Sequence, residues 1–243
     1  MIKTYKGVAY DDEEFGVIII NGTPILKRYY GSSNKVVIPS FIEKIGSYSF
    51  SGNALIEEIE LPRTLTSIGA YAFNGCRSLK IINFPDSITK IGERAFYNCV
   101  KLDKIELPEA NTLRIENEAF QCCIALKSVV LAGNVEYIGR AAFYGCHSLE
   151  KVGIFSSWGM VISSYVFRNC EKLNKVLFPE YETIKYISPS AFEVKDNPLL
   201  VIYIDDRFAY DRKIVDYCDK SHINWEKLSD DENEFLGINR VVI

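Results

Sequence analysis

The phrase IGAYAFNGC occupies residues 68–76, and a close copy, IGERAFYNC, occupies residues 91–99. The second copy begins 23 residues after the first and keeps its Ile, Gly, Ala, Phe and Cys positions. Self-similarity at a fixed period of about 20–50 residues is the signature of a protein built from stacked structural repeats. The two phrases therefore predict a repeat protein, and the rest of the chain shows how far the repeat extends.

The phenylalanine of this phrase recurs seven times in one register. The intervals between successive copies are 23, 23, 24, 23, 24 and 25 residues, for Phe50, Phe73, Phe96, Phe120, Phe143, Phe167 and Phe192. An isoleucine stands five residues before every one of them, from Ile45 to Ile187. In five copies the third residue after Phe is a cysteine, at Cys76, Cys99, Cys123, Cys146 and Cys170. Seven copies in register indicate a solenoid.

Each copy contains a short strand and a turn. Alternating segments such as IEL (59–61) and INF (82–84) predict strands with one buried face. The GxxAF portion predicts one helical turn on the opposite side. The residue before the cysteine position is Gly or Asn in five of six copies, which indicates a left-handed turn residue. Cys122 breaks this pattern, so we expect local strain or a shifted turn there. One repeat cannot bury its own apolar face, so the copies must stack.

The consensus LxxIxLPxxlxxIGxxAFxxC resembles the BspA-type branch of bacterial leucine-rich repeats over about residues 35–204. The resemblance implies an α/β-type repeat solenoid: a right-handed superhelix with a parallel concave sheet, short helical turns opposite, and end caps. We expect one continuous domain with an N-terminal capping hairpin in 1–34, seven repeats in 35–204 and a C-terminal cap in 205–243. The C-terminal cap is expected to hold a helix at about 207–220 and an acidic tail. Members of this family are typically secreted or surface proteins with binding roles, and the resemblance implies no catalytic residues.

Composition narrows the classes of function. A net charge of −4 argues against nucleic acid as the main partner, because phosphate backbones need a clustered basic face. No apolar run is long enough for membrane insertion. The start, MIKTYKGVAYDDEEFG, does not read as a secretion signal. The chain as written is therefore expected in the cytoplasm, and secretion or surface display is the alternative if a leader has been removed.

Catalytic and cofactor motifs are missing from the sequence. It has no GxSxG, GxGxxG or P-loop phrase, so we predict that the protein is not an enzyme and needs no cofactor. Seven cysteines and two histidines include no CxxC pair, which disfavours zinc. The five in-register cysteines are predicted to be buried as small hydrophobes. Cys122 and Cys218 lie off that ladder and are predicted to be the more reactive thiols, with their redox state open.

The candidate partner-binding residues lie in the later repeats. Outward strand positions include an apolar strip flanked by lysines, formed by Val130, Leu177, Val201 and Tyr203 with Lys151 and Lys175. The fourth, sixth and seventh repeats lengthen before the isoleucine and replace the following glycine by Glu116, Ser163 and Ser188. We interpret this as loss of a tight turn. Two insertions carry Trp158 and Tyr181, which are candidate interface anchors unless Trp158 only covers a gap in its own loop.

These residues predict a non-catalytic protein–protein interaction or adhesion scaffold that binds a macromolecular partner through the concave face and the inserted edge. One alternative is a glycan-binding module in which Trp158 and Tyr181 stack on sugar rings. Another is a self-assembling structural protein, because an open solenoid has two sheet ends. The expected state is a monomer or a weak homo-oligomer joined through those ends.

Overall fold

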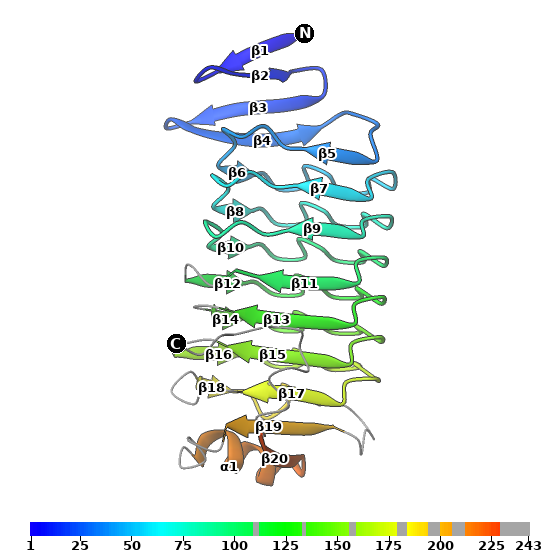
Figure 1. Cartoon of the computed structure of the whole chain (residues 1–243), viewed down its shortest axis with the longest axis vertical. Coiled ribbons are helices and arrows are strands. Elements are labelled where there is room, and N and C mark those ends of the chain that lie inside the picture. The colour runs from blue at the N-terminus through cyan, green and yellow to red at the C-terminus, as the bar shows by residue number, and fades with distance from the viewer. Residues whose placement is uncertain are drawn as a thin grey trace.

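The chain winds into a column of stacked turns, with its N-terminal strands at one end and its helix at the other (Figure 1). The computed structural model describes residues 1–108, 112–132, 135–155, 159–178, 184–193, 200–205 and 212–228. Each repeat adds one turn, so residues 23–25 positions apart in the sequence become neighbours along the column.

The alternating segments of the repeats form parallel strands on one side of the column. Three of them make a first sheet: β5 (Lys35–Val37), β7 (Glu58–Glu60) and β9 (Ile81–Asn83). Six make a second sheet: β11 (Lys104–Leu107), β13 (Ser128–Ala132), β15 (Lys151–Phe155), β17 (Lys175–Phe178), β19 (Val201–Asp205) and β20 (Asn224–Leu228). We call the outward side of these two sheets the long-strand face. The sequence predicted one continuous sheet, whereas the ladder of paired strands is interrupted between β9 and β11.

A further parallel sheet, which the sequence did not predict, runs along another side of the column. Its strands contain the repeated isoleucines: β6 (Lys44–Ile45), β8 (Ser67–Ile68), β10 (Lys90–Ile91), β12 (Leu113–Ile115), β14 (Val135–Ile138), β16 (Met160–Ile162) and β18 (Ile184–Ile187). At its N-terminal end this short-strand sheet continues into the antiparallel hairpin of β3 (Phe15–Ile20) and β4 (Thr23–Tyr29). Adjacent turns of the column are therefore joined by backbone hydrogen bonds on more than one side.

The predicted phenylalanine column is confirmed as the centre of the core. The seven rings are buried, and consecutive rings stack at centroid separations of 4.8–5.5 Å with interplanar angles of 3–13°. The spacing between paired strands, about 4.8 Å, sets the distance between the rings. Aromatic rings at this distance favour an offset stack. The same repeat that stacks the backbone thus also builds a continuous aromatic stack.

The turns opposite the long strands are not helical, and this corrects the sequence prediction. Within the described repeats, residues 48–53 and their equivalents form successive turns with no helix. Two residues of each of the first six turns are left-handed. The predicted column is confirmed, with φ of 59–75° at Gly52, Gly75, Asn98, Cys122, Gly145 and Asn169. A second column has φ of 51–61° at Tyr48, Tyr71, Arg94, Glu118, Ala141 and Tyr165. A left-handed residue interrupts a right-handed helix. The strain expected at Cys122 is confirmed by its φ of 60°.

The two ends of the column have structures of their own. The hairpin of β1 (Ile2–Tyr5) and β2 (Val8–Asp11) places Tyr5 and Tyr10 against Phe41, with ring centroids 5.0 and 5.1 Å away. At the other end α1 (Arg212–Ser221) buries Ile214, Tyr217 and Cys218. The helix was predicted at about 207–220 and is observed from 212, while 206–211 lie outside the described residues. The capping role of both segments stays a prediction.

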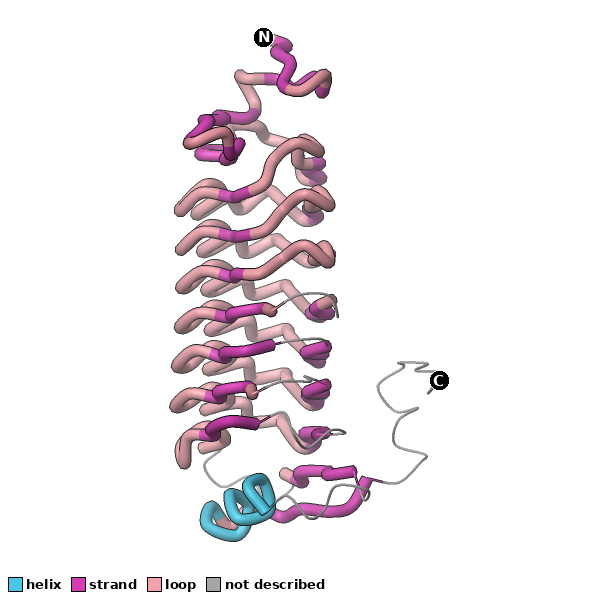
Figure 2. The backbone as a smooth tube through the Cα atoms, turned by 90° about the vertical axis from the view of Figure 1, so that its left-hand side faces the viewer, coloured by secondary structure: helices cyan, strands magenta, loops and turns pink. Residues whose placement is uncertain are grey.

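The described turns stack into a nearly straight column in both views (Figures 1 and 2). The superhelical twist and the concave curvature that the family resemblance implied therefore also stay predictions.

Candidate interaction surfaces

The glycine after each short strand is needed for contact between turns. A Cβ atom on Gly92 would lie 2.6 Å from the carbonyl carbon of Gly69, and one on Gly139 would lie 2.5 Å from the amide nitrogen of Asn117. Neither glycine has a positive φ. The interpretation that these glycines serve a tight turn is therefore wrong: they let the backbones of adjacent turns touch.

Glu116 stands where most repeats have this glycine. The pairing of β12 with β14 shifts register between Leu113 and Arg114, which adjusts the lengthened strand to its neighbour. The Glu116 carboxylate then lies 3.5 Å from the Lys90 ammonium and 3.7 Å from the Arg114 guanidinium. The two cations hold the Glu116 carboxylate in place. A charged side chain therefore follows the glycines that occupy this position in the first three turns.

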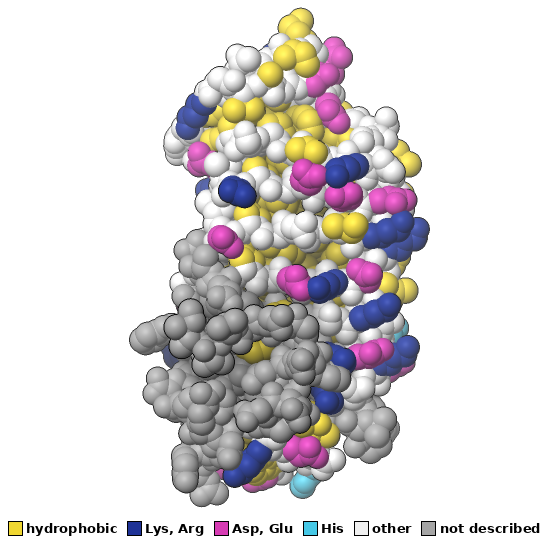
Figure 3. Space-filling view, in the orientation of Figure 1, with side chains coloured by type: hydrophobic (Ala, Val, Ile, Leu, Met, Phe, Trp, Pro, Cys, Tyr) yellow, Lys and Arg dark blue, Asp and Glu magenta, His cyan; other side chains and the backbone are white. Residues whose placement is uncertain are grey.

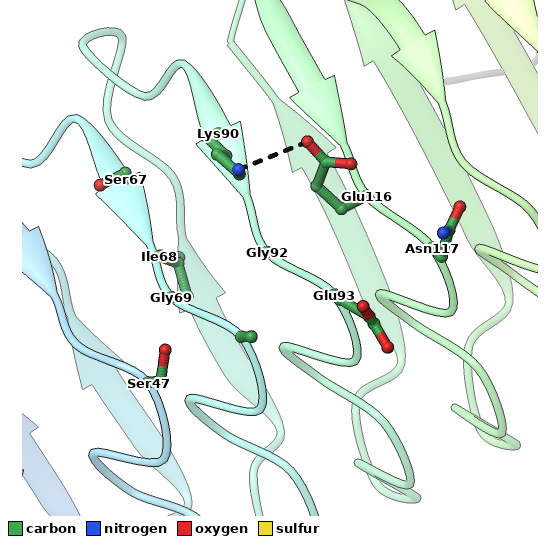
Figure 4. A pocket seen from close by; sticks show the side chains of 10 residues that line it. Ser47, Ser67, Ile68, Gly69, Lys90, Gly92, Glu93, Glu116 and Asn117 are labelled. Carbon is green, nitrogen blue, oxygen red and sulfur yellow. Dashed lines mark ion pairs between the residues drawn. The ribbon is translucent and has the colours of Figure 1, made fainter.

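A polar groove runs over Gly69 and Gly92 on the short-strand sheet, just before Glu116 (Figure 4). It has a volume of about 460 Å³, and its polar rim is formed by Ser47, Ser67, Lys90, Glu93, Glu116 and Asn117. Figure 4 shows Lys90 extending toward Glu116 between neighbouring strands. Sequence reasoning missed this groove. The signal was present, because three consecutive repeats have glycine at the same position: Gly46, Gly69 and Gly92.

Aromatic and charged side chains line the edge formed by the turns. The rings of Tyr48 and Tyr71 stack at 4.9 Å and 8°, and Tyr48 is 52% exposed. Arg94 continues the row: its Nε donates a hydrogen bond to Glu118 at 2.6 Å and its Nη1 donates to the Tyr71 hydroxyl at 2.9 Å. The left-handed residues of the second column therefore form a ladder of their own on the surface.

The long-strand face begins with charges of both signs and exposed apolar residues (Figure 3). The Lys35 ammonium lies 2.9 Å from Glu60 and 3.1 Å from Glu58, and hydrogen bonds to these two carboxylates raise the pKa of Lys35. Val37 and Ile81 lie on the same three strands and are 57% and 49% exposed. One ammonium thus offsets part of the charge of the two glutamates, and two apolar side chains are exposed beside them.

The predicted apolar strip lies on the same face in the later repeats, but it is not exposed. Val130, Leu177 and Tyr203 are buried, with 7%, 1% and 8% of their surface accessible. They occupy one in-register row, in which Gly153 has no side chain and leaves room for its neighbours. The Lys175 ammonium also lies 5.0 Å above the Tyr203 ring. The prediction of an exposed strip is therefore wrong.

The other predicted contact residues have mixed outcomes. Lys151 and Lys175 are half-buried at the start of β15 and β17. Val201 is half-buried at the start of β19. Trp158 and Tyr181 lie outside the described residues. The structure thus brings Lys175, Leu177 and Tyr203 together on one face, and whether a partner contacts any of these candidates stays a prediction.

The five ladder cysteines are packing residues, as predicted. All five are fully buried and unpaired, and each thiol donates a hydrogen bond to the carbonyl oxygen of the phenylalanine one repeat earlier. The Sγ–O distances are 3.2–3.4 Å. Burial raises the pKa of Cys76 to about 12, and it also raises the pKa of Cys99, Cys123 and Cys146. Thiols that stay protonated are poor nucleophiles.

The two cysteines off the ladder differ from each other. Cys218 is fully buried on α1, and burial raises its pKa to about 12, so the prediction that it is reactive is wrong. Its place on the apolar side of α1, next to Tyr217, explains the burial. Cys122 is half-buried in the turn edge, and its pKa is raised by burial. Cys122 is therefore the most accessible of the seven thiols.

Two further findings concern the described part of the chain. No group of three or more His, Cys, Asp or Glu side chains comes together there as a candidate metal site. No helix in the same residues is long and apolar enough to cross a membrane.

Parallel strands stacked turn on turn, with phenylalanine and cysteine ladders inside, define a β-solenoid of the leucine-rich-repeat class. The chain belongs to the BspA type leucine rich repeat region family, of which six copies match residues 43–161 and 154–210. Repeat proteins of this class are commonly protein-binding or adhesion scaffolds and are typically non-catalytic. No match was found among the curated proteins.

Several solved bacterial structures share the fold. A leucine-rich repeat protein of T. pallidum is 25% identical, with a TM-score of 0.67, over 77% of this chain and 91% of that one. A leucine-rich repeat protein from Eubacterium ventriosum is 24% identical, with a TM-score of 0.61, over 75% of this chain and 50% of that one. The pneumococcal vaccine antigen PcpA is 18% identical, with a TM-score of 0.54, over 94% of this chain and 48% of that one. This chain therefore spans about half the length of the last two.

Proposed function

We propose that this protein is a non-catalytic protein-interaction or adhesion scaffold that binds a macromolecular partner through its long-strand face and the neighbouring inserted edge. The observation that carries the proposal is the exposure of Val37 and Ile81 on that face, beside the paired charges of Lys35, Glu58 and Glu60. Apolar contacts surrounded by polar groups are the usual composition of a protein interface.

The sheet holds these side chains in a fixed arrangement. Strand pairing aligns Lys35, Glu58 and Ile81 in one row and Val37, Glu60 and Asn83 in the next. Further along the column, Lys104 pairs with Glu106 on the same face. The rows are set by backbone hydrogen bonds and by the ring stack beneath. Little conformational freedom is therefore lost when a partner binds. Nine strands about 4.8 Å apart give a face about 38 Å long, enough for the roughly 800 Å² per partner of a specific complex.

The first experiment places charge on the exposed apolar residues. Biotinylated wild-type protein is used to capture partners, and each captured protein is then purified and titrated against wild type and the Val37→Asp/Ile81→Asp variant. We expect the double variant to weaken binding about tenfold or more, because charged groups are depleted in interface cores. The matched control is Leu55→Asp/Ile124→Asp, which changes two side chains that are 56% and 42% exposed but lie in turns off the strands. Equal loss in both variants contradicts the assignment of this face.

A second variant tests the inserted edge. Trp158→Ala/Tyr181→Ala removes the two aromatic residues that the sequence places in the insertions. Reduced affinity for the same purified partner supports their role as anchors, and unchanged affinity removes the inserted edge from the proposed surface.

A glycan-binding role is the second candidate function, and the polar groove is the observation that favours it. The groove rim offers hydroxyl, amide, carboxylate and ammonium groups, and the exposed ring of Tyr48 follows Ser47, which lines the groove. Sugars bind through such polar groups and through stacking on aromatic rings. A panel of oligosaccharides separates the two candidates: binding that Tyr48→Ala and Glu93→Gln abolish, but Val37→Asp/Ile81→Asp spares, supports the glycan-binding role.

A further inference from the structure

Strand β3 (Phe15–Ile20) is the N-terminal edge of the short-strand sheet, and its outer edge has no partner in residues 1–108. The sheet order ends at β3, which pairs only with β4. No backbone hydrogen bond in that part of the chain joins β3 to another strand. Ile18, Ile19 and Ile20 are 37%, 48% and 50% exposed. Consecutive residues of a strand point to opposite faces, so the end of this strand is apolar on both.

The neighbouring hairpin does not cover this edge. Tyr5 and Tyr10 fix β1–β2 against Phe41, at the start of the long-strand side. Figure 2 shows β1–β2 displaced toward that side, whereas β3–β4 lies on the opposite side of the column. The backbone groups along the outer edge of β3 are therefore accessible to another strand.

Three other strands that end a sheet carry charges, which protect sheet edges from pairing. β5 contains Lys35, β18 contains Lys185, and β20 contains Glu226 and Lys227. β3 reads FGVIII and contains no charged residue and no proline. Its register shift lies between Gly16 and Val17, which leaves Val17–Ile20 in regular pairing. β3 is thus the unprotected edge among these four.

We propose that the outer edge of β3 pairs antiparallel with β3 of a second copy of this chain, so that two columns join at their N-terminal ends. An antiparallel pair of identical strands is related by a two-fold axis, which is the symmetry of most homodimers. With the axis near Ile19, the isoleucines of one strand lie across from those of the other and bury apolar surface on both faces of the new ladder.

The sequence of β3 favours an identical strand over a charged one, because no charged residue lies in it. The net charge of −4 on each chain opposes self-association elsewhere, so two copies can meet only at a neutral surface. β3 provides such a surface, and an identical strand brings no charge against it. A six-residue strand buries less than the roughly 800 Å² per partner of a standard interface. The dimer is therefore weak and forms at high protein concentration. This self-association is independent of the proposed partner-binding face.

Sedimentation analysis of the full chain over a wide concentration range tests the proposal. We expect wild type to pass from monomer to dimer, and Ile19→Lys to raise the dissociation constant about tenfold or more, because a lysine on an edge strand opposes pairing. The matched control Ile81→Lys changes an equally exposed isoleucine on the long-strand face and is expected to leave the dimer intact. Circular dichroism of each variant verifies that the column is folded.

Three outcomes overturn the proposal. One is a wild-type protein that stays monomeric over the whole concentration range. Another is an Ile19→Lys variant that dimerises with the same dissociation constant as wild type. The third is growth beyond the dimer, which indicates head-to-tail contacts between unlike ends. Hydrogen exchange adds a local readout: the outward amides of Val17–Ile20 are expected to gain protection as the dimer forms and to lose it in Ile19→Lys. Fast exchange of these amides in a dimeric sample places the contact elsewhere.

Discussion

The first three turns of the column and the later ones have the same interior and differ at the short-strand sheet. In the first three, β6, β8 and β10 have two residues each and are followed by glycine. In the later ones, β12, β14, β16 and β18 have three or four residues, and three of the four are followed by Glu116, Ser163 or Ser188. The phenylalanine stack passes through both regions without a break.

The difference shows which positions of the repeat are constrained by stacking. The buried Phe, Cys and Ile contact their equivalents in adjacent turns, so a change in one turn disturbs two interfaces. The glycine position is constrained only where adjacent backbones touch. Where Glu116 replaces the glycine, a side chain is accommodated, and it lines the groove. The interior is therefore uniform, and the surface varies by region.

The largest expected effect comes from the uniform interior. Phe73→Ala, in the regular turns, and Phe143→Ala, in the later turns, should each lower the free energy of unfolding by about 3–5 kcal/mol, because each leaves a cavity in the ring stack. Urea denaturation followed by circular dichroism measures both. If one variant loses less than half as much unfolding free energy as the other, the claim that the two regions share one interior is contradicted.

The glycine position should distinguish the two regions. Gly92→Ala places a methyl group 2.6 Å from the backbone of the preceding turn and should cost about 1–3 kcal/mol of stability through overpacking. Glu116→Ala is the matched change at the equivalent position, where a side chain already fits. It should cost no more than about 1 kcal/mol, the usual worth of a partly exposed ion pair. Equal costs in the two variants, measured by the same urea denaturation, argue against the close backbone contact at Gly92.

The smallest effect concerns the thiols and appears only at alkaline pH. The pKa of Cys76 is raised from 9.0 to about 12 by burial, so the unfolded chain loses this proton first as the pH rises. The stabilisation is complete below pH 9 and is lost as the pH rises toward 12. Compared with Cys76→Ala, wild type should lose an additional ~1–2 kcal/mol between pH 9 and pH 11. Unfolding free energies of both proteins across this range provide the measurement.

Thiol labelling at neutral pH is the control for that prediction. In the native protein a thiol-specific reagent should modify Cys122 at most, because the other six cysteines are buried. All seven should react after unfolding. Fast labelling of two or more ladder cysteines in the native state contradicts their burial, and the alkaline pH prediction with it.

Much of the interior could be predicted from the sequence. A constant interval from Phe50 to Phe192 identifies equivalent positions, and equivalent positions in a stack must lie in columns. The left-handed residues before the ladder cysteines could be predicted because Gly and Asn tolerate positive φ. The second left-handed column could not, since Tyr71 and Arg94 have no such preference and are held there by hydrogen bonds between turns.

The candidate surfaces were predicted less well, and the reason is physical. Strand alternation identifies Leu177 and Tyr203 as outward positions, but it gives no sign that their side chains are buried. Cys218 gave no sign of its burial, because only the position of α1 determines which side of the helix is covered. The groove lies over two glycines of adjacent turns, Gly69 and Gly92, and its volume depends on side chains from four different turns.

The amino-acid order alone determines the period, the residues that share a column and the stacked architecture. A fixed interval identifies the repeats, and the repeats must stack because one repeat cannot bury its own apolar face. How closely the turns approach follows only from their packing in three dimensions. That distance makes Gly92 obligatory, brings each ladder thiol within hydrogen-bonding distance of a phenylalanine carbonyl, and stacks the rings face to face. Packing also leaves the edge of β3 open, since its exposure depends on where the neighbouring hairpin lies.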